Sequence, residues 1–482
     1  GARAGARAGA RAGAVGEGSG AQQLGELSTA WWPAAAAAAS GFLELFPEAR
    51  PDLEAGIAPL ATDLFALSEE VLQKARREDF ACALRGLVEG SKQLDAVLPS
   101  AGFPHKVDGL ARDLLGRQAD ASFHEAADAV TRSLNRVKEA EAGGGALRES
   151  LQSLIKSVND SIAEAVQVVA SLEALGKDGV VMDSGWVREF EGSSSQHCVD
   201  LLNSLKGLME DSASHAEFGS RGGSVPEACG AGQLLLLANF ASHLSDKTVD
   251  RVADLASTTF PAGHTFESHD MKEPFQLLHQ SLLKRYVAFR GRDLSRKIQQ
   301  GLRSMEHLVA AGAPPGKALP FCESVVEALA AVDAEVSELI DEVGSRRARN
   351  GPGHRRDHST HSDPTEETHR LQRNLDKLFR EKLKIFSDSV EESQSALLGG
   401  VVNIALKSLV ESIRLATFNC EQLQQMQVNV AYLRLRIAKF SEDEAVGFLL
   451  DESLSSAGER SLNHTLLNAA EVEELVMLSS GG

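Results

Sequence analysis

The chain has 482 residues, of which 43% are hydrophobic and only 5% aromatic, and its formal net charge is −19. Cores with few aromatic residues are built from Leu, Val and Ala, as in helical bundles. An acidic chain is also a poor partner for nucleic acid, because phosphate binding needs clustered positive charge. The five cysteines, Cys82, Cys198, Cys229, Cys322 and Cys420, are scattered and odd in number, which indicates free thiols in a reducing compartment.

The chain opens with the repeat GARAGARAGARAG, which carries no large apolar side chain. Such a segment cannot bury a core, so we expect residues 1–25 to form a disordered, low-complexity tail. Helical periodicity begins at residue 26 and continues through two regions, which we assign to a first helical bundle (26–175) and a middle helical bundle (176–343). The apolar runs of the whole chain are shorter than the ~20 residues that a transmembrane helix needs, so we expect no membrane span.

Long helices alternate with clear breaks in these two regions. Six apolar residues recur at helical spacing on one face of a long amphipathic helix: Leu147, Leu151, Leu154, Val158, Ile162 and Val166. Stretches rich in Gly and Pro predict the breaks, at 99–104, 141–146, 176–185, 219–232, 260–263 and 310–316.

Residues 344–363 hold five arginines among Gly, Pro and His, without any residue suited to a core. We expect a flexible loop, which trypsin should cut before any other internal site. Its charge could also attach to anionic lipid or serve as a nuclear import patch, although a plain linker is the favoured interpretation. Asp363 and Pro364 then resemble the start of a helix, and we assign 364–482 to a C-terminal helical bundle.

The clearest pattern lies in 402–440. Apolar residues alternate at spacings of four and three from Val402 to Leu423, and after a shift of three residues the pattern continues from Met426 to Phe440. Leu433 and Leu435 also alternate with arginines as in a strand, but no Gly or Pro would end the helix first. We therefore predict a continuous helix.

The helix that we predict over 402–440 is followed by a predicted capping box at 441–444, which would start the next helix. Gln424 and Gln425 lie off the apolar stripe of the predicted helix. We therefore expect them to be dispensable for stability.

No pattern in the chain predicts enzyme chemistry, so we expect no catalytic, cofactor-binding or metal-binding residues. Residues 312–318 only partly match a phosphate-binding loop, since alanine stands where the motif needs its first Gly and its Ser or Thr. The histidines at 354, 358, 361 and 369 lie among arginines that would repel a metal ion. His197 and Cys198 are adjacent, so on a helix their side chains point apart.

Residues 412–456 carry a recognisable series of motifs. An aromatic residue precedes a Leu-Gln-Gln-x-Gln-Val element, an apolar helix then ends at a second aromatic residue, and a Leu-Leu-Asp-Glu element follows. The residues are Phe418, Leu423, Gln424, Gln425, Gln427, Val428, Phe440, Leu449, Leu450, Asp451 and Glu452. This stretch resembles the carboxy-terminal end of the vacuolar protein sorting-associated protein 51 family. The resemblance implies that these residues are structural or bind partners.

The family resemblance implies a non-enzymatic subunit of the Golgi-associated retrograde protein complex and of its endosome-associated relative. Such complexes tether endosome-derived vesicles at the trans-Golgi network, act in endocytic recycling and promote SNARE assembly. The implied fold is all-α, with helical bundles stacked into an extended rod. The implied partners are the other subunits, with SNARE proteins and small GTPases as further candidates, and partners would hold the cytosolic chain at the membrane.

Two alternatives stay open from the sequence. One is a subunit of the exocyst or of the conserved oligomeric Golgi complex, and the other is an all-α regulatory enzyme such as an exchange factor. The family's assembly is attributed to an amino-terminal helical region, for which the Gly-Ala-Arg repeat offers no heptads. We therefore expect this chain alone not to recover its sister subunits, and the complete gene to encode further helical sequence upstream.

Overall fold

The computed structural model describes residues 19–480, except 74, 76, 143–145, 182–184, 219–228, 264–266, 309–313, 341–391 and 442. Throughout these residues the regular structure is helical, and the β-type pairing is limited to an isolated bridge between Phe418 and Ser461. The predicted all-α fold is therefore confirmed. Low aromatic content did not prevent core formation, because Leu, Val and Ala supply most of the buried side chains.

The chain divides into two compact units, each of which draws on separate stretches of sequence. The first unit contains residues up to 135 together with 155–207 and 246–272, and the second contains 136–154, 208–245 and the residues from 273 onward. The division differs from our three predicted bundles, whose boundaries remain a prediction. The helices of the amino-terminal half are α2 (Ser19–Leu45), α3 (Arg50–Gln73), α4 (Arg77–Val97), α5 (Phe103–Ala142), α6 (Leu147–Leu175) and α7 (Trp186–Phe218).

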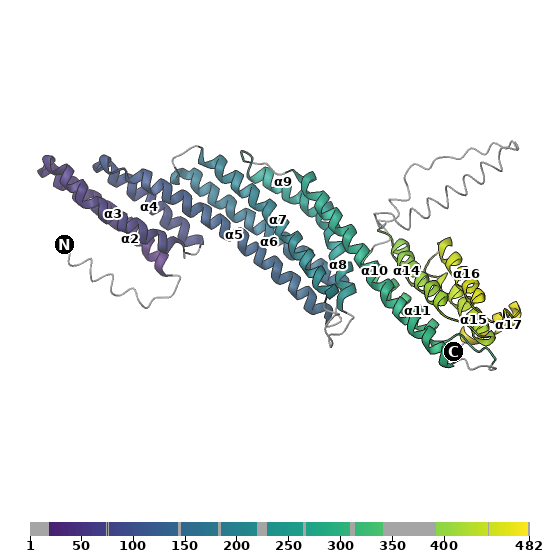
Figure 1. The fold of residues 1–482 in the computed structure, drawn as a ribbon. Coiled ribbons are helices and arrows are strands. Elements are labelled where there is room, and N and C mark those ends of the chain that lie inside the picture. Colours follow the sequence, from purple (N-terminus) through teal and green to yellow (C-terminus); the bar gives the residue numbers. More distant parts are fainter. Residues whose placement is uncertain are drawn as a thin grey trace, which may run out of the picture. The chain divides into compact units, whose positions relative to one another are not determined.

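In the first unit, α2 packs along α4, and α5, α6 and α7 lie side by side (Figure 1). The approach of α2 to α4 is close at Gly90, where a Cβ atom would overlap the buried ring of Trp32. On α6 the expected apolar stripe is buried, apart from Leu151, which is half-buried. A single long stripe thus gives α6 its packed face.

Most of the predicted breaks are found where the sequence placed them. Helix α6 begins directly after the break at 141–146, and α5 begins at Phe103, just inside the end of the break at 99–104. Gly102 and Gly179 take positive φ values of 61° and 88°, which a residue without a Cβ adopts readily. One boundary was wrong: α8 (Cys229–His243) begins inside the predicted break at 219–232.

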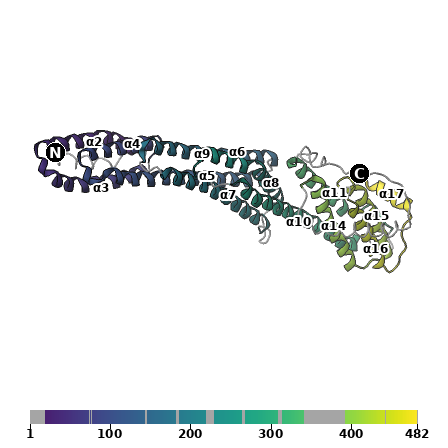
Figure 2. The same ribbon diagram turned by 90° about the horizontal axis from the view of Figure 1, so that it is seen from above.

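The second unit contains the carboxy-terminal helices. Figure 2 shows α11 grouped with α14, α15 and α16, and α17 also contacts α15. The remaining helices are α9 (Val249–Thr259), α10 (Ser268–Leu308), α11 (Pro320–Leu339), α14 (Gln394–Leu415), α15 (Cys420–Ile437), α16 (Glu444–Glu459) and α17 (Ala469–Ser480).

The continuous helix that we predicted over 402–440 is wrong. Helix α14 ends at Leu415, and α15 starts at Cys420 after an extended Asn419. The Asn419 side chain accepts from the Gln422 backbone while the Gln422 side chain accepts from the Asn419 backbone, which is a capping box. The apolar spacing is continuous across this break, so periodicity could not reveal it. For 423–437 the choice of helix over strand is confirmed.

Two further local predictions need correction. Helix α16 is capped by Asp443, whose side chain accepts from the Ala445 backbone, and not by Ser441. Helix α2 begins at Ser19, inside the segment that we assigned to the tail. The Arg-rich loop at 344–363 and the helix expected after it lie outside the described residues.

Within the described part of the chain, α14 is long and apolar enough to cross a membrane by length and composition, with a mean hydropathy of 1.5. We had expected no helix of this length and hydropathy. However, 56% of this stretch is buried inside the protein, and α14 packs on α11 and α16. A core helix of a folded bundle accounts for these properties.

Candidate partner-binding site

Helix α15 carries the central part of the family motif. Its apolar face is buried as expected: Leu423, Met426, Val430, Leu433 and Ile437 are each at most 3% exposed. The polar residues between them hold two non-helical segments that come from distant parts of the chain. This arrangement was not apparent from the sequence.

The first segment is 316–319, which Gln425 and Asn429 hold through backbone groups. The Gln425 Oε1 accepts from the Gly316 N–H at 2.9 Å, and its Nε2 donates to the Lys317 carbonyl at 2.9 Å. The Asn429 Oδ1 accepts from the Leu319 N–H at 3.0 Å. Gln425 is 3% exposed and Asn429 is fully buried, so we call this pair the buried amide ladder. Our expectation that Gln425 lies off the packed face was wrong.

The second segment is 465–467, which Gln424 and Gln427 hold in a similar way. The Gln424 Nε2 donates to the Thr465 carbonyl at 3.2 Å. The Gln427 side chain makes two bonds to Leu467, accepting from its N–H at 2.9 Å and donating to its carbonyl at 3.2 Å. Both glutamines are only partly buried, and we call them the open amide ladder.

The other motif residues lie where α14, α15 and α16 meet. Val428 and Leu450 are fully buried, and Phe418 is 2% exposed. The Phe418 backbone accepts from the Leu462 N–H and donates to the Arg460 carbonyl, both at 3.2 Å. The motif therefore joins the helices of one bundle.

Two acidic motif residues of α16 form ion pairs with neighbouring helices. Asp451 pairs with Arg434 of α15, and Glu452 pairs with Arg414 of α14 at 2.7 Å. Phe440 and Leu449 are half-buried near the ends of this contact region. Both ion pairs are solvent-accessible, so each contributes little to stability by itself.

The segment that partly matches a phosphate loop is engaged by protein side chains. The N–H groups that such a loop would offer to phosphate are bonded to Gln425 at Gly316 and to Ser479 at Ala318, the latter at 2.8 Å. Residues 314–318 therefore cover α15 and do not form a cradle.

His197 and Cys198 both lie inside α7. Cys198 is 1% exposed, and burial raises the pKa of its thiol to about 12. The His197 Nε2 lies 2.7 Å from Asp120 of α5. A buried thiol with a raised pKa is a poor nucleophile.

The metal-site candidates give no positive result. No cluster of three or more potential metal ligands occurs among the described residues. The histidines at 354, 358, 361 and 369 fall in the undescribed 341–391.

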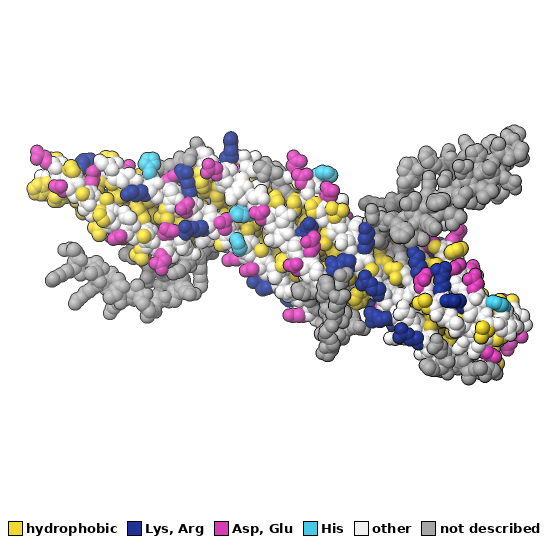
Figure 3. All heavy atoms as spheres, viewed as in Figure 1, with side chains coloured by type: hydrophobic (Ala, Val, Ile, Leu, Met, Phe, Trp, Pro, Cys, Tyr) yellow, Lys and Arg dark blue, Asp and Glu magenta, His cyan; other side chains and the backbone are white. Residues whose placement is uncertain are grey.

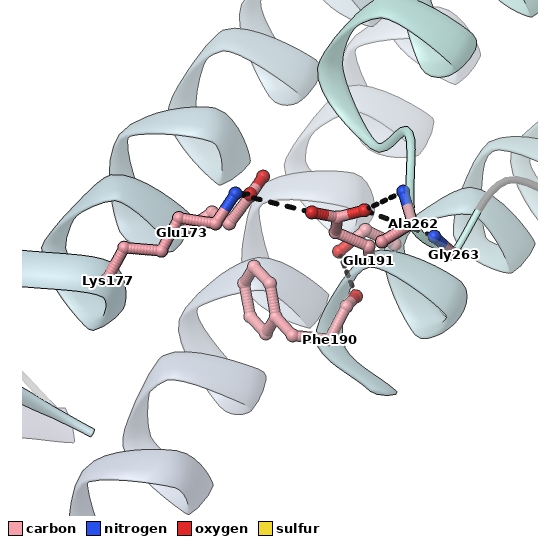
Figure 4. Close-up of polar contacts among 7 residues, drawn as sticks. Glu173, Lys177, Phe190, Glu191, Ala262 and Gly263 are labelled. Atoms are coloured by element: carbon pink, nitrogen blue, oxygen red, sulfur yellow. Dashed lines mark hydrogen bonds and ion pairs between the residues drawn. The ribbon is translucent and has the colours of Figure 1, made fainter. Parts of the chain in front are cut away.

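A buried charge cluster in the first unit was missed at the sequence level. Glu191 of α7 is 1% exposed and accepts from the backbone N–H groups of Ala262 and Gly263, at 2.5 and 3.1 Å. Lys177 approaches it from the other side, at 3.4 Å, and also pairs with Glu173 of α6 (Figure 4). A Cβ at Gly263 would overlap the backbone of α7, so this position requires glycine.

The electrostatics of this cluster follow from burial. Desolvation is the main cause that raises the pKa of Glu173, and its hydrogen bond to Lys177 acts in the opposite direction. The same hydrogen bond raises the pKa of Lys177, whose side chain is 48% exposed. We attribute the cluster to joining α6, α7 and the segment after α9, because Glu191 satisfies two backbone donors there.

Helix α10 has a basic face that the net charge conceals. Residues 284–303 hold seven Lys and Arg and one acidic residue, and Figure 3 shows basic side chains gathered over this helix. Arg292, Arg296 and Arg303 follow spacings of four and seven, and all three are exposed. Net charge alone therefore does not describe this surface, and the exclusion of nucleic acid remains a prediction.

No family model matches the chain. Among curated proteins it is similar to vacuolar protein sorting-associated protein 51 homologues of several organisms. It is 26% identical to the Danio rerio protein over 464 residues, covering 86% of this chain and 54% of the relative. It is 26% identical to the Homo sapiens protein (88% and 57%) and 23% identical to the Arabidopsis thaliana protein (91% and 60%). The chain thus spans a little over half the length of these relatives.

Proposed function

The chain is related to the vacuolar protein sorting-associated protein 51 family, and on that premise we propose that it is a non-enzymatic subunit of a vesicle-tethering complex. The observation that carries the proposal is the similarity to these homologues over most of the chain, from vertebrates to a plant. It extends the motif resemblance of 412–456 well beyond the carboxy-terminal helices.

We propose further that the complex acts in retrograde transport from endosomes to the trans-Golgi network and in endocytic recycling, and that it promotes SNARE-dependent fusion. In this proposal the chain is cytosolic and peripheral at those membranes, and the other subunits are its main partners. The support is the family resemblance of the motif around α15. Tethering of this kind needs helical surfaces that bind proteins and requires no catalytic site.

We assign the motif residues a mainly structural role. Leu423, Val428 and Leu450 are buried where helices meet, and Gln425 binds backbone inside the bundle. A protein that works by binding others needs such a stable bundle to present its surfaces. Gln424 and Gln427 differ, since both remain accessible.

Purification from native cells tests the proposed function. The endogenous gene would be tagged, so that the complete product is expressed, and the protein isolated under mild conditions for mass spectrometry. We expect the sister subunits of the retrograde complex and of its endosome-associated relative in stoichiometric amounts. Recovery of exocyst or conserved oligomeric Golgi subunits instead would move the chain to that complex, and recovery of no helical subunits would overturn the proposal.

A further inference from the structure

The two amide ladders of α15 hold similar backbone but differ in accessibility. The buried ladder holds 316–319, and its Gln425 and Asn429 are at most 3% exposed, although Gly316 and Lys317 are themselves exposed. The open ladder holds 465–467 at the surface, where residues 462–466 are all exposed. Its bond to Thr465 is exposed and its two bonds to Leu467 are partly buried, so the ladders differ mainly in the burial of their own amide side chains.

The open ladder recognises a backbone conformation and not a side-chain sequence. Gln424 and Gln427 are one helical turn apart and bond residues two apart, Thr465 and Leu467, in a segment without regular structure. The rise between such helix positions is about 4.5 Å, and extended residues two apart are separated by about 6.6 Å. The flexible glutamine side chains cover this difference. Any extended peptide offers the same carbonyl and N–H groups.

A cavity next to the ladder adds side-chain selectivity. Its volume is about 300 Å³, and its lining includes Leu423, Leu454 and Leu466, with Asp451 and His464 at its polar side. His464 and Leu466 belong to the segment that the open ladder holds, and Leu466 is 50% exposed. The cavity suits an apolar side chain next to backbone that the ladder holds.

We propose that the open ladder and this cavity form a peptide-binding site, which residues 461–467 occupy in cis. Its partner is an extended segment of another protein, with an apolar residue at the position of Leu466. The cis segment is thus a reversible cover that competes with the partner. Side-chain amides that pair with extended backbone resemble recognition by strand addition, in which backbone bonds supply affinity and a pocket supplies selectivity.

The cis segment itself supplies the evidence for this occupant. It is seated on the site through the backbone of Thr465 and Leu467, and at its start the Leu462 side chain is 93% exposed. The segment has no regular structure between Leu462 and the start of α17. The inference concerns this surface alone and does not depend on membership of a particular complex.

Binding of a synthetic peptide tests the proposal. The probe is a fluorescein-labelled peptide with the sequence of residues 460–468, titrated with the full chain under reducing conditions and followed by fluorescence anisotropy. We expect saturable binding. The double variant Gln424→Ala/Gln427→Ala should weaken it by about tenfold or more, because it removes three hydrogen bonds. The exposed Gln300→Ala on α10 is the matched control and should change nothing.

Two variants of the cis segment leave the site intact and move binding in opposite directions. Leu467→Pro removes the N–H that donates to Gln427, so the cover is weakened and the peptide should bind several-fold more tightly. Thr465→Cys places a thiol beside Cys420, whose Sγ lies 3.8 Å from the Thr465 carbonyl. Its oxidised form should exclude the peptide, and reduction should restore binding.

Three results would overturn the proposal. The first is no binding by wild type and by Leu467→Pro alike, with both folded by circular dichroism. The second is binding that the double glutamine variant does not weaken. The third is a concentration-dependent dimer in sedimentation that Leu467→Pro abolishes, since this would assign the site to the same segment of a second copy.

Discussion

Gln424 and Gln425 are neighbours in the sequence, yet they serve different segments of the chain. The buried Gln425 bonds the backbone of Gly316 and Lys317, and the accessible Gln424 bonds that of Thr465. Water can replace the bond of Gln424 more readily than the partly buried bonds of Gln425.

We therefore expect Gln425→Ala to lower the free energy of unfolding by about 1–3 kcal/mol, since it removes two hydrogen bonds of a buried side chain at about 0.5–1.5 kcal/mol each. Gln424→Ala should cost less than about 1 kcal/mol. Urea unfolding followed by circular dichroism compares the two. Equal losses would show that the two ladders do not differ in burial as we describe.

We expect the stability of the protein to depend on pH through the carboxyl of Glu173. Burial raises its pKa, so the folded protein holds this proton more tightly than the unfolded chain does. The stability from this group is complete below the unfolded pKa and is lost as pH rises through the folded pKa. Glu173→Gln has the shape of the protonated carboxyl but cannot ionise. Its melting temperature should therefore equal that of wild type at low pH and rise above that of wild type as the pH increases.

Thermal melts at pH 5 and pH 8 measure this difference. Glu191→Ala is the contrasting change, because it removes the acceptor of the Ala262 and Gly263 N–H groups, and it should destabilise at both pH values. A Glu173→Gln variant that falls further below wild type at pH 8 than at pH 5 would mean that the pair with Lys177 outweighs desolvation.

At the scale of elements, the junction between α14 and α15 depends on a cap. Asn419 and Gln422 satisfy each other's backbone N–H groups, and the chain turns there without Gly or Pro. We expect Asn419→Ala to cost about 0.5–2 kcal/mol. Asn135→Ala, at an exposed position of α5, is the control and should be neutral or slightly stabilising in urea unfolding.

The packed faces of α14 and α15 make a second test at this scale. Leu409 is fully buried and Leu433 is 1% exposed, whereas Leu435 is 51% exposed. Leu409→Asp and Leu433→Asp should each destabilise the bundle by about 3–5 kcal/mol through burial of an unpaired charge. Leu435→Asp should change the melting temperature little. A comparable loss at Leu435 would place it in a contact that the exposed fraction does not reveal.

At the scale of the whole molecule, the family resemblance predicts bundles stacked into a rod, and this stays a prediction for the full chain. A compact globule of 482 residues would have a radius of gyration of about 23 Å. We expect small-angle X-ray scattering to give a much larger value and a distance distribution with a long tail. A value near the compact one would favour the alternative of a globular all-α regulatory enzyme.

The sequence by itself determined the fold class and several helix boundaries, and it carried the resemblance to a family. Helical periodicity with Leu, Val and Ala predicted α6 and its buried stripe, and Gly- and Pro-rich stretches predicted the breaks before α5, α6 and α7. These properties are local: a helix face or a chain reversal is encoded within a few residues of itself. The motif of 412–456 could be recognised without a structure because it, too, is a local pattern of residues.

Only the tertiary structure decided which polar residues are buried and what they hold. Gln425 meets a segment about 110 positions earlier, through Gly316, and Glu191 meets Ala262 and Gly263 about 70 positions later. The break at 416–419 also escaped prediction, because the apolar spacing continues across it while the backbone does not. From the sequence alone, a polar side chain that will be buried cannot be told from one that stays solvated. The reason is that a distant segment of the chain supplies its hydrogen-bond partner.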